Sequence, residues 1–273
     1  MAEHLLRRAD PQGVFLTGDV GFNLLEPLRD KMGPRFINAG IAEQNMIGAA
    51  AGLADTGLRP ICYSIAPFLY ARAFEQIRND LCFPNRPVTL IGNGGGYGYG
   101  VMGPSHHALE DYGVLCALPN MTCMIPAFAA DIPECLDQAK GPTYIRLGKC
   151  EKPHYYSPGR FKTWRRIQKA GNDATVVVGP LAGRVVNLPR THSLWILSQL
   201  PLLLDEIPQD LRDLDHLTVI EEHTAQGGAG MQLLYALHTL GCPPRHVEHK
   251  CAHGYPSGTY GSQDFHRKES GLV

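Results

Sequence analysis

The sequence lacks long apolar runs, and it lacks a strong excess of charge of either sign. A membrane-spanning helix needs roughly 18 or more consecutive apolar residues, and no run of that length occurs. The formal net charge of -1 gives no electrostatic reason to expect a nucleic-acid or acidic-membrane partner. The N-terminus carries basic residues without the apolar stretch of a secretory signal, so we expect none.

The sequence also lacks a C-x-x-C pair, although it holds eight cysteines. This absence excludes a zinc ribbon and a dithiol redox motif. Most of the cysteines lie in apolar stretches, as Cys62 does, where a thiol acts as a small hydrophobic side chain. A reducing cytoplasm is therefore the predicted location. His246, His249, Cys251 and His253 are spaced like metal ligands, but no second ligand group frames them, so we expect a solvated polar loop and no metal site.

Short apolar runs rich in β-branched residues alternate with helical patterns over the first half of the chain. This alternation predicts a parallel sheet that is covered by helices on both faces. The predicted strands are 13–17, 35–38, 60–64, 88–92, 121–126 and 143–147, and the predicted helices are 42–56, 67–81, 108–115 and 131–139.

A polar stretch with two prolines, residues 150–170, has no apolar periodicity and predicts a linker. Beyond it the sequence predicts strands 174–179 and 217–221 and a helix over 226–240. The residues from Gly254 onward are rich in glycine, serine and charge, and we expect them to be loosely ordered.

These patterns predict two consecutive three-layer α/β domains with mostly parallel sheets. The first domain is predicted to span residues 1–155 and the second residues 165–273.

The segment around Glu43 joins a predicted strand to a predicted helix. The strand ends at Asn38, Gly40 makes the turn, and Glu43 lies in the first turn of the helix. A carboxylate in that place is stabilised by the helix N-terminus. Spacing alone therefore favours an ordinary helix-end glutamate.

The residues around Glu43 change this interpretation. Residues 40–60, GIAEQNMIGAAAGLADTGLRP, closely resemble the signature of the transketolase and deoxyxylulose-phosphate synthase family. The resemblance implies that Glu43 hydrogen-bonds N1′ of the aminopyrimidine ring of thiamine diphosphate, which helps the cofactor lose its C2 proton. It also implies that Ile41 lies at the cofactor, that Phe68 stacks on the flat ring, and that Arg72 lies near the cofactor or a subunit interface. A core phenylalanine and a solvated arginine remain the alternatives for Phe68 and Arg72.

A glycine-rich stretch, residues 92–106, allows a close backbone approach to a ligand. It ends in Gly-Pro-Ser-His-His, which resembles the family's G-P-T-H motif. The resemblance implies that His106 lines the active site, where it binds substrate or moves a proton, with His107 as a second candidate. A satisfied loop histidine is the alternative.

Two basic residues lie at the end of the predicted strand 143–147 and just after it. Arg146 and Lys149 resemble the family's phosphate-anchoring positions, and the alternative is a solvated charge at a strand end. The sequence also departs from the family: Met102 stands where transketolases have an acidic residue, and Asn93 with glycines stands where the synthases have an arginine. Both departures predict an unusual substrate.

The resemblance covers the pyrimidine-binding domain and, more weakly, an apparently shortened transketolase C-terminal domain. No segment of this sequence is identified as the family's diphosphate-binding domain, which holds Mg²⁺; Gly18 and Asp19 resemble its G-D-G motif only superficially, so we expect no metal site in these residues. The expected partner is an alpha subunit that holds the metal and diphosphate, in an α₂β₂ heterotetramer.

The resemblance thus implies the beta subunit of a split, thiamine-diphosphate-dependent enzyme. Such an enzyme would transfer a two-carbon ketol or acyl unit from a keto donor to a carbonyl acceptor. Two alternatives stay open: a beta chain of a 2-oxo-acid dehydrogenase complex, and a non-catalytic assembly subunit.

Overall fold

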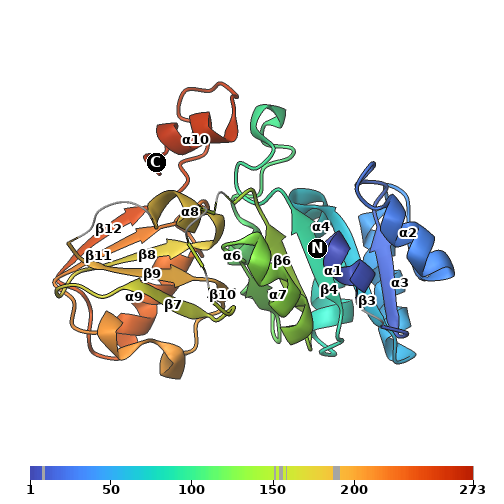
Figure 1. Ribbon diagram of the computed structural model, residues 1–273, viewed down its shortest axis with the longest axis horizontal. Helices are drawn as coiled ribbons and strands as arrows, with labels where there is room; N and C mark the ends of the chain where they lie inside the picture. Colours follow the sequence, from blue (N-terminus) through green and yellow to red (C-terminus); the bar gives the residue numbers. More distant parts are fainter. Residues whose placement is uncertain (8–9, 151, 154–155, 158, 187–190, 273) are drawn as a thin grey trace.

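The computed structural model of the protein describes residues 1–7, 10–150, 152–153, 156–157, 159–186 and 191–272. The predicted domain ends at residues 155 and 273 lie outside the described residues. Two β-sheets with flanking helices lie side by side along the longest axis of the molecule, as Figure 1 shows. The predicted α/β fold with mostly parallel sheets is confirmed.

The first sheet has seven strands. In spatial order they are β10 (Gln199–Leu200), β5 (Thr122–Met124), β6 (Thr143–Leu147), β4 (Thr89–Asn93), β3 (Arg59–Ile65), β1 (Gly13–Thr17) and β2 (Phe36–Asn38). All five residues of β1 are buried, as expected for a strand covered on both faces. The pairs are parallel except at the edge, where β10 from the second half of the chain pairs antiparallel with β5.

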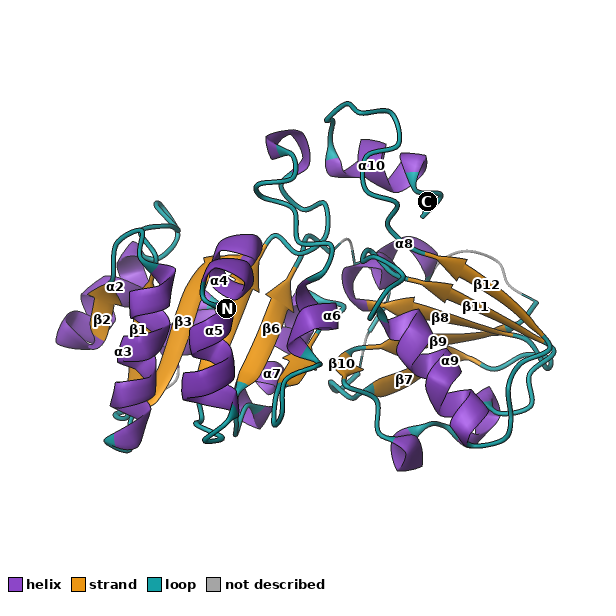
Figure 2. Cartoon of the chain, turned by 180° about the vertical axis from the view of Figure 1, so that it is seen from behind, coloured by secondary structure: helices purple, strands orange, loops and turns teal. Residues whose placement is uncertain are grey.

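Helices cover both faces of this sheet, and Figure 2 shows one of these layers in front of the strands. Val14 and Leu16 of β1 point to one face, where they join Met46 of α3 (Glu43–Asp55) and Leu69 of α4 (Ala66–Arg72) in one apolar cluster. Phe15 points to the opposite face, since side chains alternate along a strand. The other helices of this half are α1 (Ala2–Arg7), α2 (Glu26–Met32), α5 (Phe74–Gln76), α6 (Asp111–Leu115) and α7 (Ile132–Gln138).

The prediction of one continuous helix over 67–81 is wrong. The α-helix ends at Arg72, Ala73 leaves helical geometry, and after α5 the chain forms a π-helix over Ile77–Cys82. Ala73, Ile77 and Leu81 are all fully buried at intervals of four residues. Residues four apart lie on one face of an α-helix, so this buried spacing predicts an unbroken helix and gives no sign of the π turn.

The second sheet has five strands, in the order β12 (His246–Lys250), β11 (His216–Ile220), β8 (Ala174–Val178), β9 (Ser193–Leu197) and β7 (Trp164–Gln168). They are parallel except β7, which runs antiparallel to β9. The helices α8 (Ala182–Val185), α9 (Ala229–Thr239) and α10 (Gln263–Glu269) belong to this half.

Both edge strands of the second sheet differ from the sequence prediction. Strand β7 lies inside the predicted linker 150–170, and β12 contains His246 and His249, which were expected in a loop. Edge strands face solvent and carry polar side chains, so neither has the apolar run that marked the inner strands. Within the described part of the chain no group of three or more metal-ligating side chains gathers, and no helix there could span a membrane.

Two consecutive buried glutamates after β11 connect the halves. Glu221 accepts hydrogen bonds from His249 Nε2 (2.6 Å), from the N-terminal amides of α9 and from the Tyr112 hydroxyl of the first half. Burial alone would raise the pKa of Glu221, but these hydrogen bonds outweigh it and hold that pKa below its usual range. Glu222 accepts from the Tyr97 amide (2.7 Å) and from Arg267 Nε of α10 (2.8 Å).

Helix α10 of the C-terminal segment is firmly packed, contrary to the expectation of loose order, whereas residues 256–260 before it are exposed. His266 and Arg267 of α10 are buried, and the His266 ring stacks on Tyr97 with centroids 4.9 Å apart. Figure 1 shows α10 above the sheets, beside the loop that follows β4. Because this segment is rich in glycine and charge, its sequence did not predict that His266 and Arg267 would be buried.

We expect Glu222→Ala to lower the free energy of unfolding by about 3–5 kcal/mol, because it removes the close, buried carboxylate partner of Arg267 and leaves only the more distant, half-exposed Asp264. Urea unfolding measures this loss. Glu206→Ala, at an exposed position, serves as the control and should stay within about 0.5 kcal/mol of wild type. A loss below about 1 kcal/mol for Glu222→Ala would contradict the anchoring role.

Candidate functional site

The predicted site lies at the carboxyl ends of the parallel strands, where open α/β sheets bind ligands. Glu43 is the first residue of α3, and its side chain is 3% exposed. Ser64 near the end of β3 donates its hydroxyl to Glu43 Oε1 at 3.4 Å. Gly18 follows β1, and a Cβ there would come within 3.5 Å of Glu43 Oε1. The carboxylate is thus enclosed by two strand ends.

Arg72 contacts the remaining side of Glu43. Its Nη1 lies 3.1 Å from both carboxylate oxygens. The same guanidinium lies over the Phe68 ring, with its carbon 3.7 Å from the ring centroid. Arg72 is itself 44% exposed at the end of α4. A flat nitrogen group therefore rests on Phe68 and donates to Glu43.

His106 completes this cluster. Its ring meets Phe68 edge-on with centroids 5.1 Å apart, and the Tyr99 ring lies 5.6 Å away. Its Nδ1 is 2.9 Å from Ser105 Oγ. We refer to Glu43, Ser64, Phe68, Arg72 and His106 as the Glu43 site.

Four of these residues were predicted from the sequence, and the structure brings them into one chain of contacts. Ser64 and the neighbouring Tyr99 were missed. Ser64 could have been found, because it lies at a predicted strand end on the edge where Glu43 was placed. Ile41 is 77% exposed next to the site, and Lys149 is exposed in the loop after β6.

His107 lies away from the solvent, 3% exposed. Its Nε2 is 2.8 Å from Gly100 O, and because a carbonyl oxygen only accepts, Nε2 must carry the proton. Nδ1 then accepts from the Tyr255 hydroxyl at 2.8 Å. Both ring nitrogens are thus used in holding the loop that carries His106 against the C-terminal segment.

Arg146 is also buried, between the two sheets. Its Nε donates to Asp111 at 2.8 Å, and its Nη2 donates to Ala108 O and Glu222 O. The glycine-rich stretch packs on these side chains: a Cβ on Gly95 would lie 2.5 Å from Arg146. The close approach expected for these glycines is therefore made here by the protein's own side chains.

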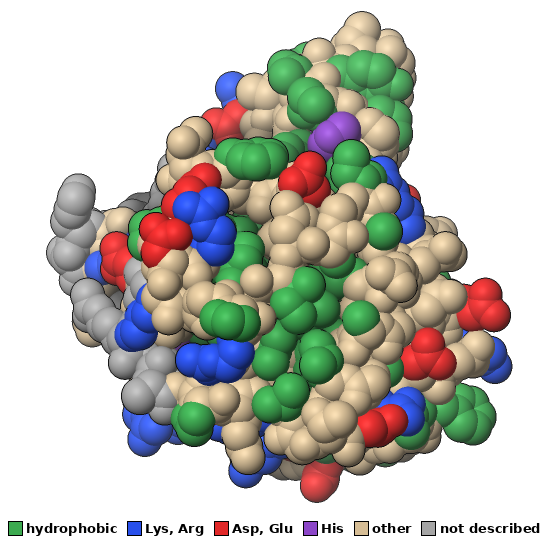
Figure 3. Space-filling view, turned by 90° about the vertical axis from the view of Figure 1, so that its right-hand side faces the viewer, with side chains coloured by type: hydrophobic (Ala, Val, Ile, Leu, Met, Phe, Trp, Pro, Cys, Tyr) green, Lys and Arg blue, Asp and Glu red, His purple; other side chains and the backbone are tan. Residues whose placement is uncertain are grey.

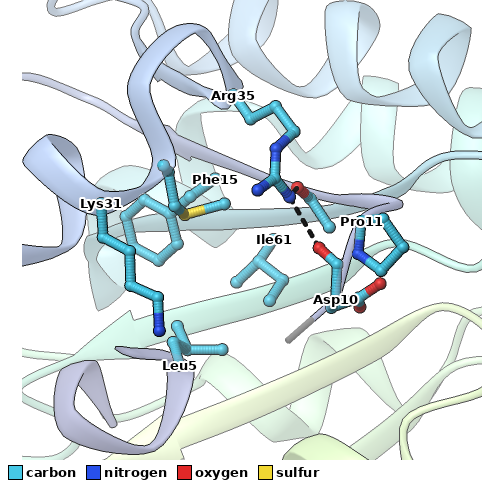
Figure 4. Close-up of a pocket in the computed structure, with 9 residues that line it drawn as sticks. Leu5, Asp10, Pro11, Phe15, Lys31, Arg35 and Ile61 are labelled. Carbon is cyan, nitrogen blue, oxygen red and sulfur yellow. Dashed lines mark hydrogen bonds between the residues drawn. The ribbon is translucent and has the colours of Figure 1, made fainter. Parts of the chain in front are cut away.

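A cavity of about 330 Å³ lies elsewhere. Gly13, Arg35 and Ile61 line it at the amino ends of the strands, opposite the Glu43 site. In Figure 4 the Arg35 guanidinium points to the backbone of Asp10, and Nη1 donates to Asp10 O at 2.6 Å. Its distance from the Glu43 site argues against a role in the same chemistry.

A buried carboxylate, an aromatic ring and a partly exposed histidine thus lie together at the carboxyl ends of parallel strands. Comparison with known proteins gives the family. The model of the transketolase pyrimidine-binding domain matches residues 4–153, and the chain belongs to this family.

Similar proteins include two curated relatives and one solved structure. A subunit of the apulose-4-phosphate transketolase of Actinobacillus succinogenes is 29% identical, over 80% of this chain and 75% of that protein. The protein of the same name from Phocaeicola vulgatus is 28% identical, over 91% of this chain and 87% of that protein. A solved split-gene transketolase, described as an inactive beta4 tetramer, matches with a TM-score of 0.80 and 27% identity, over 100% of this chain and 92% of that chain.

We expect the unfolding free energy to fall as the pH drops below about 6.5, the ordinary pKa of histidine. Burial, followed by the nearby charges of His266 and His106, lowers the pKa of His107 against the opposing effects of Gly100 O and Glu222. A group with a lowered folded-state pKa stabilises above its unfolded-state pKa, and this stability is lost as the pH falls through the folded-state value.

Urea unfolding at a series of pH values between about 8 and 5 tests this dependence. His107→Gln keeps a polar side chain that does not titrate and should show a shallower slope. Some slope should remain, because the pKa of His266 is also lowered, by burial first. Identical slopes in the variant and the wild type would contradict the assignment to His107.

Proposed function

We propose that the chain is the pyrimidine-binding subunit of a split, thiamine-diphosphate-dependent transketolase-like enzyme. The observation that carries this proposal is the flat guanidinium of Arg72, which stacks on Phe68 and donates to Glu43. An aminopyrimidine ring is also flat and shares a proton through a ring nitrogen. The residues present therefore fit the pyrimidine end of the cofactor.

The residues of the Glu43 site take distinct roles in this proposal. When bound, thiamine diphosphate supplies a carbon nucleophile for the carbonyl of a keto donor. Glu43 holds a proton at ring atom N1′, Phe68 stacks on the ring, and Ser64 orients the carboxylate. His106 is partly exposed beside Phe68 and binds the substrate oxygen or moves a proton to it.

The substrate contacts are assigned differently from the sequence expectation. The ring nitrogens of His107 and the donors of Arg146 are already engaged by buried groups, so we assign them to packing. Lys149 remains the proposed basic contact for substrate. Met102 is 54% exposed, and an apolar side chain in that place favours a donor without the usual sugar hydroxyl pattern.

The metal and diphosphate are assigned to a partner alpha subunit. In the described residues no group of metal-ligating side chains gathers, and both curated relatives are named as one subunit of a transketolase. Figure 3 shows hydrophobic side chains gathered in the middle of the end of the molecule that carries α2, α3 and β2. Exposed large hydrophobic residues of these elements and their loops are Phe22, Leu24, Ile37 and Ile41. Such a surface suits a protein partner in a two-fold α₂β₂ assembly that transfers a two-carbon unit.

We expect Glu43→Ala to lower cofactor-dependent turnover by about 10²- to 10⁴-fold, the range for loss of a positioned proton-sharing group. Turnover is measured on the complex with the alpha subunit, Mg²⁺ and thiamine diphosphate. Glu75→Ala removes an exposed glutamate and should leave turnover unchanged. Equal turnover in Glu43→Ala and wild type would refute the role of Glu43.

We also expect the chain alone to lack turnover and tight cofactor binding, and both to appear on addition of the alpha subunit. Co-purification with the neighbouring gene product, followed by calorimetric titration with thiamine diphosphate and Mg²⁺, measures this. Tight binding and turnover by the chain alone would contradict the split site. A stable complex that never binds the cofactor would instead favour a non-catalytic assembly subunit.

A further inference from the structure

The guanidinium of Arg72 uses the contacts that the pyrimidine ring requires. It covers a face of Phe68 at 3.7 Å and lies 3.1 Å from both oxygens of Glu43. A ring that stacks on that face and shares a proton with that carboxylate needs the same space. Arg72 and the pyrimidine therefore exclude each other.

The two members of the ion pair differ in their exposure. Glu43 is 3% exposed, so its charge is costly to leave without a partner. Arg72 is 44% exposed and lies at the last position of α4, so its side chain can turn outward into water. An ion pair with one exposed member contributes little net stability and is readily exchanged for another donor.

We propose that Arg72 is an internal competitor for the cofactor: it satisfies Glu43 while the site is empty, and the pyrimidine ring must displace it to bind. This inference rests on the proposed function and goes beyond the resemblance, which implies only that Arg72 lies near the cofactor or a subunit interface. The apparent cofactor affinity is then reduced by the fraction of molecules in which Arg72 is in place.

The first test is direct binding of thiamine diphosphate with Mg²⁺ to the complex with the alpha subunit. Arg72→Ala removes the competitor and should tighten binding roughly three- to tenfold, the range expected for losing an ion pair with one exposed member and one cation–π contact. Arg72→Lys keeps the charge without the flat fork and should tighten binding less. Arg78→Ala is the matched control, because Arg78 is exposed a few residues later, and its affinity should equal wild type.

The second test needs neither the partner nor the cofactor. A water-soluble carbodiimide with an amine nucleophile labels accessible carboxylates, and peptide mass spectrometry reports labelling at Glu43. Arg72→Ala should raise labelling at Glu43 several-fold in the isolated chain, whereas Arg78→Ala should not. Circular dichroism melting establishes that both variants are folded.

The outcomes separate the two claims. Unchanged or weaker cofactor binding by Arg72→Ala, beside normal binding by wild type, would overturn the competitor role and leave the proposed function standing. Unchanged labelling at Glu43 in Arg72→Ala would also overturn it, because Arg72 would then not cover the carboxylate. If the wild-type complex did not bind thiamine diphosphate saturably, the proposed function itself would be refuted.

Discussion

The relative placement of the two halves depends on the hydrogen bonds that the buried Glu222 carboxylate accepts. This carboxylate holds the Tyr97 amide at the root of the loop that carries His106, and it holds Arg267 of the C-terminal helix. A Cβ on Gly96 would lie 2.6 Å from this side chain, so the loop can approach it only through glycine. The position of His106 is therefore tied to a residue that follows β11 of the second sheet, although His106 itself lies beside the first sheet.

The Glu43 site, in contrast, is held together by contacts within one half of the chain. Its parts come from the start of α3, the end of β3, helix α4 and the loop after β4, and they meet through direct contacts within the first half of the chain. The proposed chemistry thus belongs to the first half, and the second half positions one loop. This division agrees with a family in which the pyrimidine-binding domain is the matched unit.

Much of the secondary structure of the first half could be predicted, because it depends on residues that are close in the sequence. The strands at 13–17 and 143–147 were predicted with the observed bounds. The first is buried along its whole length, and a strand covered on both faces has a nearly continuous apolar sequence. The segment from Gly40 to Glu43 carried its own family motif. The proximity of Glu43 to Phe68, Arg72 and His106 followed from that resemblance rather than from spacing.

The rest could not be predicted, because the deciding contacts are distant in the sequence. His107 is held by Tyr255, and Arg146 by the backbone of Glu222, so neither burial can be read from the residues nearby. Polar edge strands such as β7 and β12 lack the alternation that marks a strand. The covering of Glu43 by Arg72 needed coordinates, since sequence spacing does not show which oxygen a guanidinium reaches.

The short strand β10 has a consequence for how the chain is cut and synthesised. It supplies the antiparallel edge of the first sheet through Gln199 and Leu200, which pair with Met124 and Cys123 of β5. A fragment that ends near residue 155 would leave β5 as an open, apolar edge, which is a template for pairing with other chains. The same edge stays open on a nascent chain until residue 200 has left the ribosome. Self-association of truncated fragments is thus a property of this topology rather than of the Glu43 site.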